Sequence, residues 1–556
     1  MPLAGFGIFG HTVVGREISV DGSSPSLFSQ IKGMFGQNVV KHLLIEARPF
    51  DRDLDAEVEM NYSDSVVYLE DPYHNRLKGS ITFTQDVQVD AISPNARTAK
   101  GSIKILVSHD DYTDPNMPTD FHKYLFGCRS LVVKLGGQVN GVEMPLSEYG
   151  TILGGKIRDV EWSETPEGDV LEFNFQDARL ALRTPALATK YAGTGGIEGG
   201  EDLKEKRKPK NYGRIENYRP VFLGQNETAT GNIYHLNDGE IQQINKVKDG
   251  GYEILPSQEV GDVFFYEFTE QEVDDREYVY ELDRSLIMLP YDPPGDITVD
   301  FYGDADASLG GYVETAPEIA YRIAIQAGVS PNDLTQTAFL GLANRNSAPV
   351  SYSLDIGSAI EVDRAISEVL ADLWAFPIGN REGKVSCARV ELGYYGAQVS
   401  IKKEEVYALR KGTDTVSAKD LVVFFRKNWF VQKAGDLAKN ADPDDLGFAV
   451  EEYRKVIAST DASVTDDFLD AKSFEIKTKF AIDTDALTEQ ARRFFLLKEQ
   501  RHFYTAIVGK HSFSINVGQN VNLQYGKWGL ENGKDFFVFS VKDDTLTGTT
   551  TLGLWG

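Results

Sequence analysis

The sequence predicts a mainly β protein of several domains with an α+β insertion. Its 556 residues exceed the roughly 250–300 residues that a single hydrophobic core supports. Apolar and polar residues alternate along short runs near both ends of the chain, as in half-buried strands. Helical periodicity is concentrated between them, from about 304 to 400. About three or four domains are therefore expected.

Strands are predicted over the first 180 residues, where three runs alternate apolar and polar side chains. This period is typical of strands with one buried face, so an antiparallel barrel or sandwich is expected. The apolar faces are formed by Ile81, Phe83, Val87 and Val89, by Ile103, Ile105 and Val107, and by Leu171, Phe173 and Phe175.

A glycine-rich, charged stretch interrupts the strands. Residues 193–200 contain five glycines, and residues 201–210 are mostly charged. This composition offers little apolar surface to bury, so a linker or exposed loop is predicted. Alternation resumes from about 211 to 303, where Asp238-Gly239 and Gly250-Gly251 are predicted hairpin turns.

Two helices are predicted in the central insertion. The first begins near Thr315, which can cap it together with Glu318 in a capping box, and Gly328 suits its carboxyl-terminal end. The second runs from about 360 to 375. Its apolar face consists of Val362, Ile366, Val369, Leu370 and Leu373.

The last part of the chain returns to strands. These are predicted at 420–430, 474–480, 521–525 and 536–541. One helix interrupts them near 485–500, with an apolar stripe formed by Leu487, Ala491, Phe494 and Phe495.

The charge balance is acidic. The chain has 57 Lys and Arg against 84 Asp and Glu, a formal net charge of −27. Such a surface repels phosphate backbones and anionic headgroups, so direct nucleic-acid binding is not expected. The acidity fits two interpretations, a general solubility adaptation or a channel to which DNA must not adhere.

Cysteine usage and hydropathy argue against further classes of protein. With only Cys128 and Cys387, one chain cannot build a disulfide framework or a four-cysteine metal site. The first ten residues have no basic region, and no run of 18 apolar residues occurs. We therefore expect neither Sec-dependent export nor stable membrane insertion.

One cluster contains residue types that bind divalent metals. It consists of His109, Asp110, Asp111, Tyr112 and His122. Because Asp114-Pro115 and Pro118 mark this segment as a loop, turn formation is the favoured interpretation. No metal and no cofactor are expected.

Catalytic signatures are missing from the sequence. It contains no Gly-x-Ser-x-Gly, His-Glu-x-x-His or phosphate-loop motif, and residues 461–470 lack the glycine and glutamate of a calcium loop. Paired carboxylates are the groups that glycosidases use, but adjacent pairs are expected among 84 acids. We assign no catalytic residue and do not expect an enzyme. The pairs are Asp110-Asp111, Asp274-Asp275, Asp444-Asp445 and Asp466-Asp467.

Aromatic residues are abundant and have two interpretations. They lie within apolar patterns, which favours a core or subunit contact over a sugar-stacking surface. The residues concerned are Phe424, Phe425, Trp429, Phe494 and Phe495.

Three blocks follow one another in the second half of the chain. They span 208–244, 315–389 and 428–556, and their motif positions are Tyr212, Gly213, Tyr234, Asp238, Gly239, Trp374, Trp429, Tyr453, Trp555 and Gly556. In their order and spacing these blocks resemble the central hub protein of the tail baseplate in long-tailed, non-contractile phages. Members of this family also occur in gene-transfer-agent-like particles.

The resemblance implies an architecture of four domains. Residues 1–184 and 401–556 would form tube-like β-barrels, the latter with one helix. Residues 185–303 would form a β-rich domain and 304–400 a small α+β domain. Three copies with two barrels each would then fit beneath a six-fold tail ring.

The resemblance also implies partners and a location. The chain would form a homotrimer at the distal tip of the virion tail after assembly in the host cytoplasm. Its partners would be the distal tail protein ring, the carboxyl terminus of the tape-measure protein, and a central fibre or receptor-binding protein. DNA would contact it only in transit.

Two other functions compete with this assignment. A tail-associated protein that binds glycans or degrades polysaccharide or cell wall is the main alternative, since glycosidases seldom carry short signatures. A secreted host β-protein is the other, and the missing signal peptide argues against it.

Overall fold

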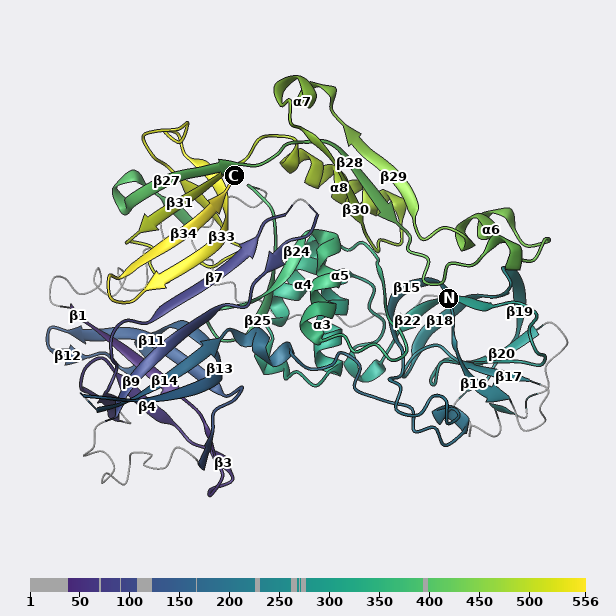
Figure 1. The fold of residues 1–556 in the computed structure, drawn as a ribbon, viewed down its shortest axis with the longest axis horizontal. Coiled ribbons are helices and arrows are strands. Elements are labelled where there is room, and N and C mark those ends of the chain that lie inside the picture. Colours follow the sequence, from purple (N-terminus) through teal and green to yellow (C-terminus); the bar gives the residue numbers. More distant parts are fainter. Residues whose placement is uncertain are drawn as a thin grey trace, which may run out of the picture.

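The computed structural model describes residues 39–69, 72–90, 92–107, 123–166, 168–225, 231–261, 268, 269, 271, 277–393 and 399–556. The fold is mostly β and consists of several sheets, as predicted. Figure 1 shows helices at the centre of an elongated molecule, with β segments on both sides. The predicted cluster from His109 to His122 lies outside the described residues. Within them, no helix is long and apolar enough to cross a bilayer.

Residues 39–176 form the first β unit, in which hydrogen-bonded strands follow the order β4-β1-β11-β13-β14-β9-β7. β6 pairs with β4, and a bridge between Leu77 and Ile105 connects the chain after β6 to β9. The pairings therefore lead from β4 to β9 and, through the chain after β6, back to β4. The main strands are β1 (Val39–Ala47), β4 (Met60–Ser63), β6 (Pro72–Asn75), β7 (Thr82–Gln88), β9 (Lys100–Val107), β11 (Ser130–Val139), β13 (Gly150–Thr165) and β14 (Gly168–Gln176).

The alternation predicted for this unit is confirmed. Phe83, Ile103, Ile105, Leu171 and Phe173 are buried in one core. Val89 and Val107, at the ends of their runs, are half-buried. Short strands complete the unit: β2 (Phe50–Asp51), β3 (Ala56–Glu57), β5 (Val67–Tyr68), β8 (Asn95–Ala96), β10 (Tyr124–Leu125) and β12 (Val142–Glu143).

The glycine-rich stretch between the first β unit and the next sheet is irregular, as predicted, but it is not fully exposed. Leu203 is buried against Tyr191 in a hydrophobic cluster. The Lys208 ammonium pairs with Glu198 at 2.7 Å. One leucine and one ion pair thus fix a segment whose composition predicts a free linker.

A nine-stranded sheet follows, in the order β16-β17-β21-β20-β19-β18-β22-β15-β23. The predicted hairpin at Gly250-Gly251 is confirmed: both glycines have positive φ, and Asp249 pairs with Tyr252. The strands are β15 (Lys210–Tyr218), β16 (Val221–Gln225), β17 (Asn232–His235), β18 (Ile241–Asp249), β19 (Tyr252–Glu259), β20 (Glu277–Glu281), β21 (Leu286–Leu289), β22 (Ile297–Asp304) and β23 (Ser351–Leu354).

The predicted hairpin at Asp238-Gly239 is wrong. β17, before this turn, pairs with β16 and β21, whereas β18, after it, pairs with β19 and β22. The two strands therefore leave the turn toward different partners. A turn dipeptide reports a change of direction but not which strands pair across it.

Helices α3 (Ala316–Gln326), α4 (Gln336–Arg345) and α5 (Val362–Leu370) form the central segment, with the hairpin β24 (Ala375–Gly379) and β25 (Val385–Arg389). α3 begins after Thr315, and Gly328 has φ +88° just beyond its end, as predicted. The Thr315 hydroxyl donates to the Glu318 carboxylate at 2.6 Å and caps no backbone N–H, so the predicted capping box is incomplete. The apolar face predicted for α5 is buried.

The chain then builds a three-stranded sheet, β28 (Ala418–Phe425), β29 (Arg454–Thr460) and β30 (Lys472–Lys477), against which α8 (Asp483–Leu497) packs. The stripe predicted for α8 is wrong in part, because Ala491 and Phe495 are exposed. Glu489 and Arg493 are buried instead, since a polar network occupies this face. The short helices α6 (Pro443–Ala449) and α7 (Ala462–Asp467) lie in the connections.

The second β unit consists of strands in the order β26-β32-β33-β34-β31-β27. It joins the first β unit through β7, which pairs with β9 on one side and β33 on the other. Figure 1 shows β7 running between the two units. The strands are β26 (Val399–Ile401), β27 (Val406–Asp414), β31 (His502–Val508), β32 (Asn520–Leu523), β33 (Lys534–Asp544) and β34 (Thr549–Trp555).

Candidate functional site: the joint between the β units and the central helices

Two of the three predicted motif tryptophans, Trp374 and Trp555, meet where the two β units contact the central helical segment. We call this place the joint and define it by Trp374, Arg381, Glu489, Asp543 and Trp555. Two of these residues lie after α5 and in the β24–β25 turn, one lies on α8, and two lie in the second β unit. The joint thus combines segments that are far apart in sequence.

Trp374 and Trp555 form the apolar part of the joint. Both side chains are almost fully buried, and their rings pack edge to face with centroids 5.9 Å apart. Trp374 Nε1 donates to the carbonyl of Asp90 at 2.8 Å, so its polar atom is satisfied. Next to Trp555, the amide and carbonyl of Gly556 both bond to the backbone of His502.

Glu489 forms the charged part of the joint. Its carboxylate binds Arg492 at 2.6 Å and Arg493 at 3.1 Å, and it also binds Arg389. Burial alone would raise the pKa of Glu489, but the surrounding guanidinium groups outweigh burial and hold this pKa below its usual value. The carboxylate therefore stays ionised within the protein.

Arg493 extends this network to the backbone of neighbouring segments. It is buried and donates to the carbonyls of Ala371 at 2.8 Å and of Ile92 at 3.3 Å. Asp372 beside it is buried and pairs with Lys479 at 3.3 Å. Burial raises the pKa of Asp372, against the opposing effect of Lys479. One arginine thus connects α8 with the central helices and the chain after β7.

Arg381 connects three parts of the molecule. From the β24–β25 turn, it donates to the carbonyl of Ile152 in the first β unit at 2.9 Å. It also binds the carboxylate of Asp543 at 2.6 Å and the carbonyl of Ile515 at 2.7 Å. Both Arg381 and Asp543 are largely buried, so this pair fixes the hairpin against both β units.

Tyr212 and Gly213 occupy a change of partner within β15. Gly213 pairs with Ser351 of β23, whereas Arg214 pairs with Tyr302 of β22. Gly213 has φ +68°, and a Cβ there would lie 1.9 Å from the carbonyl oxygen of Val350. Tyr212 is buried, and its hydroxyl donates to Gln326 of α3 at 2.7 Å. Glycine is needed because the strand must turn next to another backbone.

Tyr234, Asp238 and Gly239 lie in the nine-stranded sheet, away from the joint. Tyr234 is buried and packs against Phe222 with centroids 5.6 Å apart. Asp238 accepts bonds from Thr189 through its carboxylate and from Lys210 through its carbonyl. Gly239 has φ +95°. These residues hold the turn between β17 and β18.

Trp429 lies at a second contact, between the nine-stranded sheet and the segment after β28. Trp429 Nε1 donates to Ser351 at 3.3 Å, and the Lys427 ammonium lies 4.0 Å from the centre of its ring. Tyr453 packs against Phe424. Nine of the ten motif positions therefore fall at the joint, at this second contact, at the bend in β15 and in the nine-stranded sheet, and Tyr453 lies against β28.

The remaining candidate residues are the paired carboxylates and the two cysteines. Asp445 pairs with Lys246 and Lys248, and Asp466-Asp467 is exposed at the end of α7. Asp110-Asp111 and Asp274-Asp275 lie outside the described residues. Where side chains are described, no group of three or more His, Cys, Asp or Glu is placed to hold a metal ion. Cys128 is exposed and Cys387 is buried, and both are free thiols.

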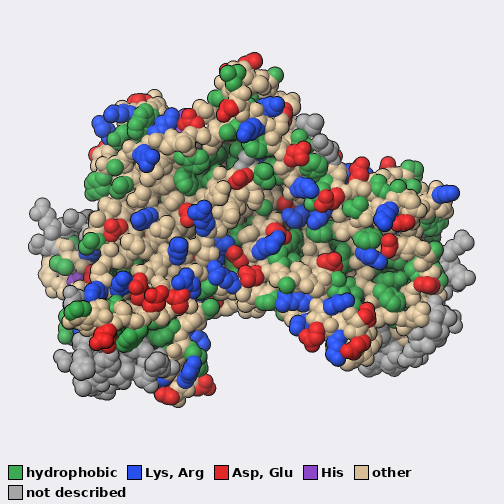
Figure 2. Space-filling model, in the orientation of Figure 1, with side chains coloured by type: hydrophobic (Ala, Val, Ile, Leu, Met, Phe, Trp, Pro, Cys, Tyr) green, Lys and Arg blue, Asp and Glu red, His purple; other side chains and the backbone are tan. Residues whose placement is uncertain are grey.

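Sequence reasoning missed Glu489 and the roles of Arg381 and Asp543. A signal was present, because Ala486, Glu489, Gln490 and Arg493 recur at helical spacing. Counting apolar residues alone ignores such a face. Figure 2 shows acidic and basic side chains intermixed over the visible face. Arg389 and Arg493 of the joint are buried and do not belong to this surface.

Comparisons with known proteins add the following. No protein-family model matches the chain. No curated protein matches it either. Several solved structures do, at low identity.

A tail protein from Neisseria meningitidis is 10% identical, with 92% of this chain and 96% of that chain covered and a TM-score of 0.37. The 43 kDa tail protein of prophage MuSo2 from Shewanella oneidensis is 9% identical, with 93% of this chain and 98% of that chain covered and a TM-score of 0.39. A chain of a native gene transfer agent particle is 11% identical, with 68% of this chain and 92% of that chain covered and a TM-score of 0.38.

The names of these structures agree with the resemblance to phage tail proteins drawn from the sequence. Their TM-scores lie below 0.5 and their identities near 10%. Likeness at this level does not assign a function to this chain.

Proposed function

We propose that this chain is the structural hub of a phage tail tip. The observation that carries the proposal is the shared strand β7, which pairs with β9 of the first β unit and with β33 of the second. Two sheet units are thereby held side by side within one chain. The motif blocks that resemble tail hubs support the same function, since several of their residues fix the joint that holds these units together.

The proposed assembly is a homotrimer. Three copies of a chain with two adjacent β units offer six units around a ring, which suits an adaptor between a six-fold tail ring and a three-fold central fibre. In this proposal both β units act as tube-like barrels, within domains 1–184 and 401–556. Domain 185–303 is β-rich, and domain 304–400 is the α+β insertion.

The proposed role is mechanical. The trimer closes the tail channel before infection and opens when receptor contact is relayed through the fibre, so that the tape-measure protein and then DNA leave. Its partners are the distal tail protein ring above, the tape-measure carboxyl terminus within, and a central fibre or receptor-binding protein below. An acidic chain of formal charge −27 suits a channel that DNA crosses without binding.

The proposed location is the distal tip of the virion tail, after assembly in the host cytoplasm. The buried charged groups of the joint pair with one another and with backbone carbonyls, which supports a structural role for them over a catalytic one. The alternative is a tail-associated protein that binds glycans or degrades polysaccharide. A cleft lined by tyrosines next to Asp249 favours its glycan-binding form.

Immunogold electron microscopy of intact tailed particles tests the proposal, with antibody raised against residues 1–180. We expect label at the distal tail tip and, by cryo-electron microscopy, three-fold symmetry of the labelled body. Label along lateral fibres, or on no particle, would reject the hub assignment and favour the adsorption protein.

A further inference from the structure

A cleft of about 580 Å³ lies at the tip of the β18–β19 hairpin. One wall comes from this hairpin, with Asp249, Tyr252 and Ile254. Another comes from the loop between β21 and β22, with Tyr291 and Pro294. The third comes from residues 436–440, before α6. Segments that are distant in sequence thus build one site, and its volume is in the usual range for small-ligand pockets.

The cleft is fixed by hydrogen bonds and ion pairs. The amide of Ala438 donates to the carbonyl of Gly250 at 2.7 Å, which holds the third wall against the hairpin. Behind it, Asp445 of α6 pairs with Lys246 at 3.0 Å and with Lys248 at 3.5 Å. These contacts keep the walls in place before any ligand arrives, which lowers the entropic cost of binding.

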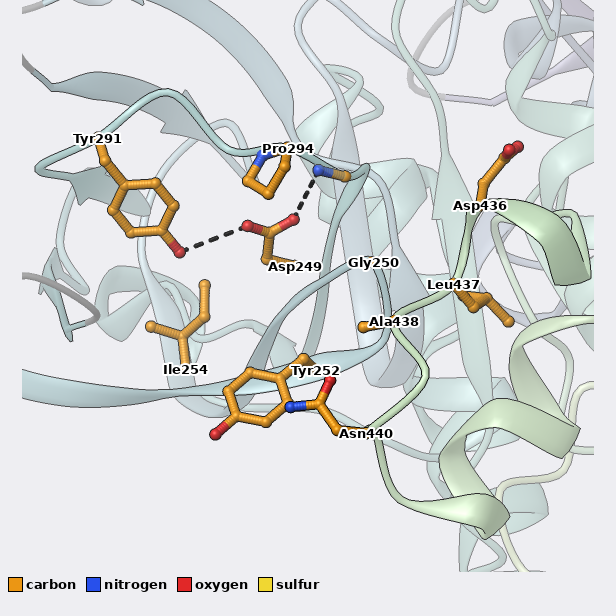
Figure 3. Close-up of a pocket in the computed structure, with 11 residues that line it drawn as sticks. Asp249, Gly250, Tyr252, Ile254, Tyr291, Pro294, Asp436, Leu437, Ala438 and Asn440 are labelled. Atoms are coloured by element: carbon orange, nitrogen blue, oxygen red, sulfur yellow. Dashed lines mark hydrogen bonds between the residues drawn. The ribbon is translucent and has the colours of Figure 1, made fainter.

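On one side of the cleft, the carboxylate of Asp249 is held by two hydrogen-bond donors. Figure 3 shows the hydroxyl of Tyr291 directed at the carboxylate of Asp249, which also accepts a bond from the amide of Gly295. The amide donates to it at 2.8 Å, and the hydroxyl at 3.5 Å. Burial raises the pKa of this carboxyl group, against the effect of these two donors. The side chain is therefore oriented by the protein and carries further acceptor capacity.

The opposite side of the cleft combines an aromatic ring with an amide. Tyr252, Asn440 and Ile254 line this side, and Figure 3 shows Ile254 between Tyr252 and Tyr291. Tyr252 is 45% exposed, so one part of its ring is open to a ligand, whereas Ile254 is buried. The side chains of Asp436 and Leu437 point away from Asp249 in this view. An open ring beside paired polar groups is the arrangement that receives a molecule with one apolar face and several hydroxyl groups.

The lining also discriminates by charge. Among the described residues that line the cleft there are two aspartates and no lysine or arginine. Phosphate, sulfate and acidic sugars would meet a carboxylate without a compensating cation. Neutral sugars lack this penalty, and the carboxylate and amide offer both acceptors and donors to their hydroxyl groups.

We propose that this cleft binds a neutral saccharide, with Tyr252 packed against the apolar face of a sugar ring and with Asp249 and Asn440 bonded to its hydroxyl groups. The proposal goes beyond the hub function and does not depend on it, because a saccharide site can serve any surface-exposed protein.

The test uses the full chain and a panel of glucose, galactose, N-acetylglucosamine and their short oligomers. Saturation-transfer NMR detects binding, and calorimetry measures it. We expect at least one neutral sugar to bind, and Tyr252→Ala to weaken its affinity about tenfold or more. Asp249→Asn preserves the shape of the side chain and is expected to weaken the same affinity.

Tyr407→Ala is the matched control, because Tyr407 is 72% exposed on β27, outside the cleft. We expect it to leave the affinity unchanged. The proposal is overturned if no neutral sugar of the panel binds, or if binding is insensitive to Tyr252→Ala. Immunogold labelling of tails is a separate measurement, so failure of the hub assignment and failure of the saccharide site are distinguishable.

Discussion

Gly213 shows how one residue without a side chain permits the bend in β15. Its φ is +68°, and an added Cβ would lie 1.9 Å from the carbonyl oxygen of Val350. We expect Gly213→Ala to lower the free energy of unfolding by about 2 kcal/mol or more, because it adds both a clash and backbone strain. Chemical denaturation monitored by circular dichroism measures this loss.

Gly341→Ala is the control for Gly213→Ala. Gly341 lies within α4, and an added Cβ there meets no atom within 4 Å. Alanine is the better helix former, so we expect this variant to be unchanged or more stable by up to about 1 kcal/mol. Equal effects of the two substitutions would contradict the role given to the bend.

Glu489 is the residue on which the charged network depends. Glu489→Gln leaves Arg389, Arg492 and Arg493 without their shared carboxylate, so we expect a loss of about 3–5 kcal/mol in the free energy of unfolding at neutral pH. Denaturant titration of both proteins measures the difference. Glu201→Gln is the control, since the exposed pair of Glu201 with Lys204 is worth less than about 1 kcal/mol.

The loss of stability caused by Glu489→Gln depends on pH. The pKa of Glu489 in the folded protein lies below the ordinary value of 4.5. The stability contributed by its charge is thus fully present above pH 4.5 and is lost as the pH falls through the folded-state pKa. We expect the difference between wild type and Glu489→Gln to shrink on acidification below pH 4.5. A constant difference would show that ionisation of Glu489 contributes no stability.

At the scale of elements, the β24–β25 turn fixes the central segment to both β units through Arg381. Arg381→Ala leaves Asp543 buried without its cation, so we expect a loss of about 3–5 kcal/mol. We also expect faster amide exchange in β33, which hydrogen-exchange mass spectrometry measures. Arg364→Ala removes an exposed arginine from α5 and is expected to change neither quantity measurably. Faster exchange in both variants would reject a specific role for Arg381.

Elements with a strong local pattern could be predicted from the sequence. α3 and α5 begin close to the expected residues because apolar spacing acts within one helix, although α5 ends at Leu370, before the expected 375. α4 was not predicted, since its only buried side chains are Phe339, Leu342 and Ala343. The turn at Asp238-Gly239 was assigned to the wrong pairing because strand partners are chosen by the whole sheet. Similarly, the face of α8 depends on arginines from other segments.

At the scale of the whole molecule, the proposed assembly predicts a mass. In sedimentation velocity and native mass spectrometry, we expect a species of three times the 61.7 kDa chain. A monomer at all concentrations, or an even-numbered ring, would contradict the trimer. The order of the motif blocks could be read from the sequence, whereas the union of the first and second β units in one sheet could not. The local sequence of β7 does not indicate that β33 is its neighbour.

The shared strand β7 also has a consequence for biosynthesis, because its partner β33 is synthesised much later. The amide of Ile81 bonds to Thr545, 464 positions later, and β33 follows β7 by nearly the whole chain. At about 5–20 residues per second, the ribosome supplies β33 roughly 20–90 s after β7. Until then one edge of β7 is an unpaired template for other chains. A chaperone that shields this edge during translation would therefore raise the yield of folded protein more than one added after release.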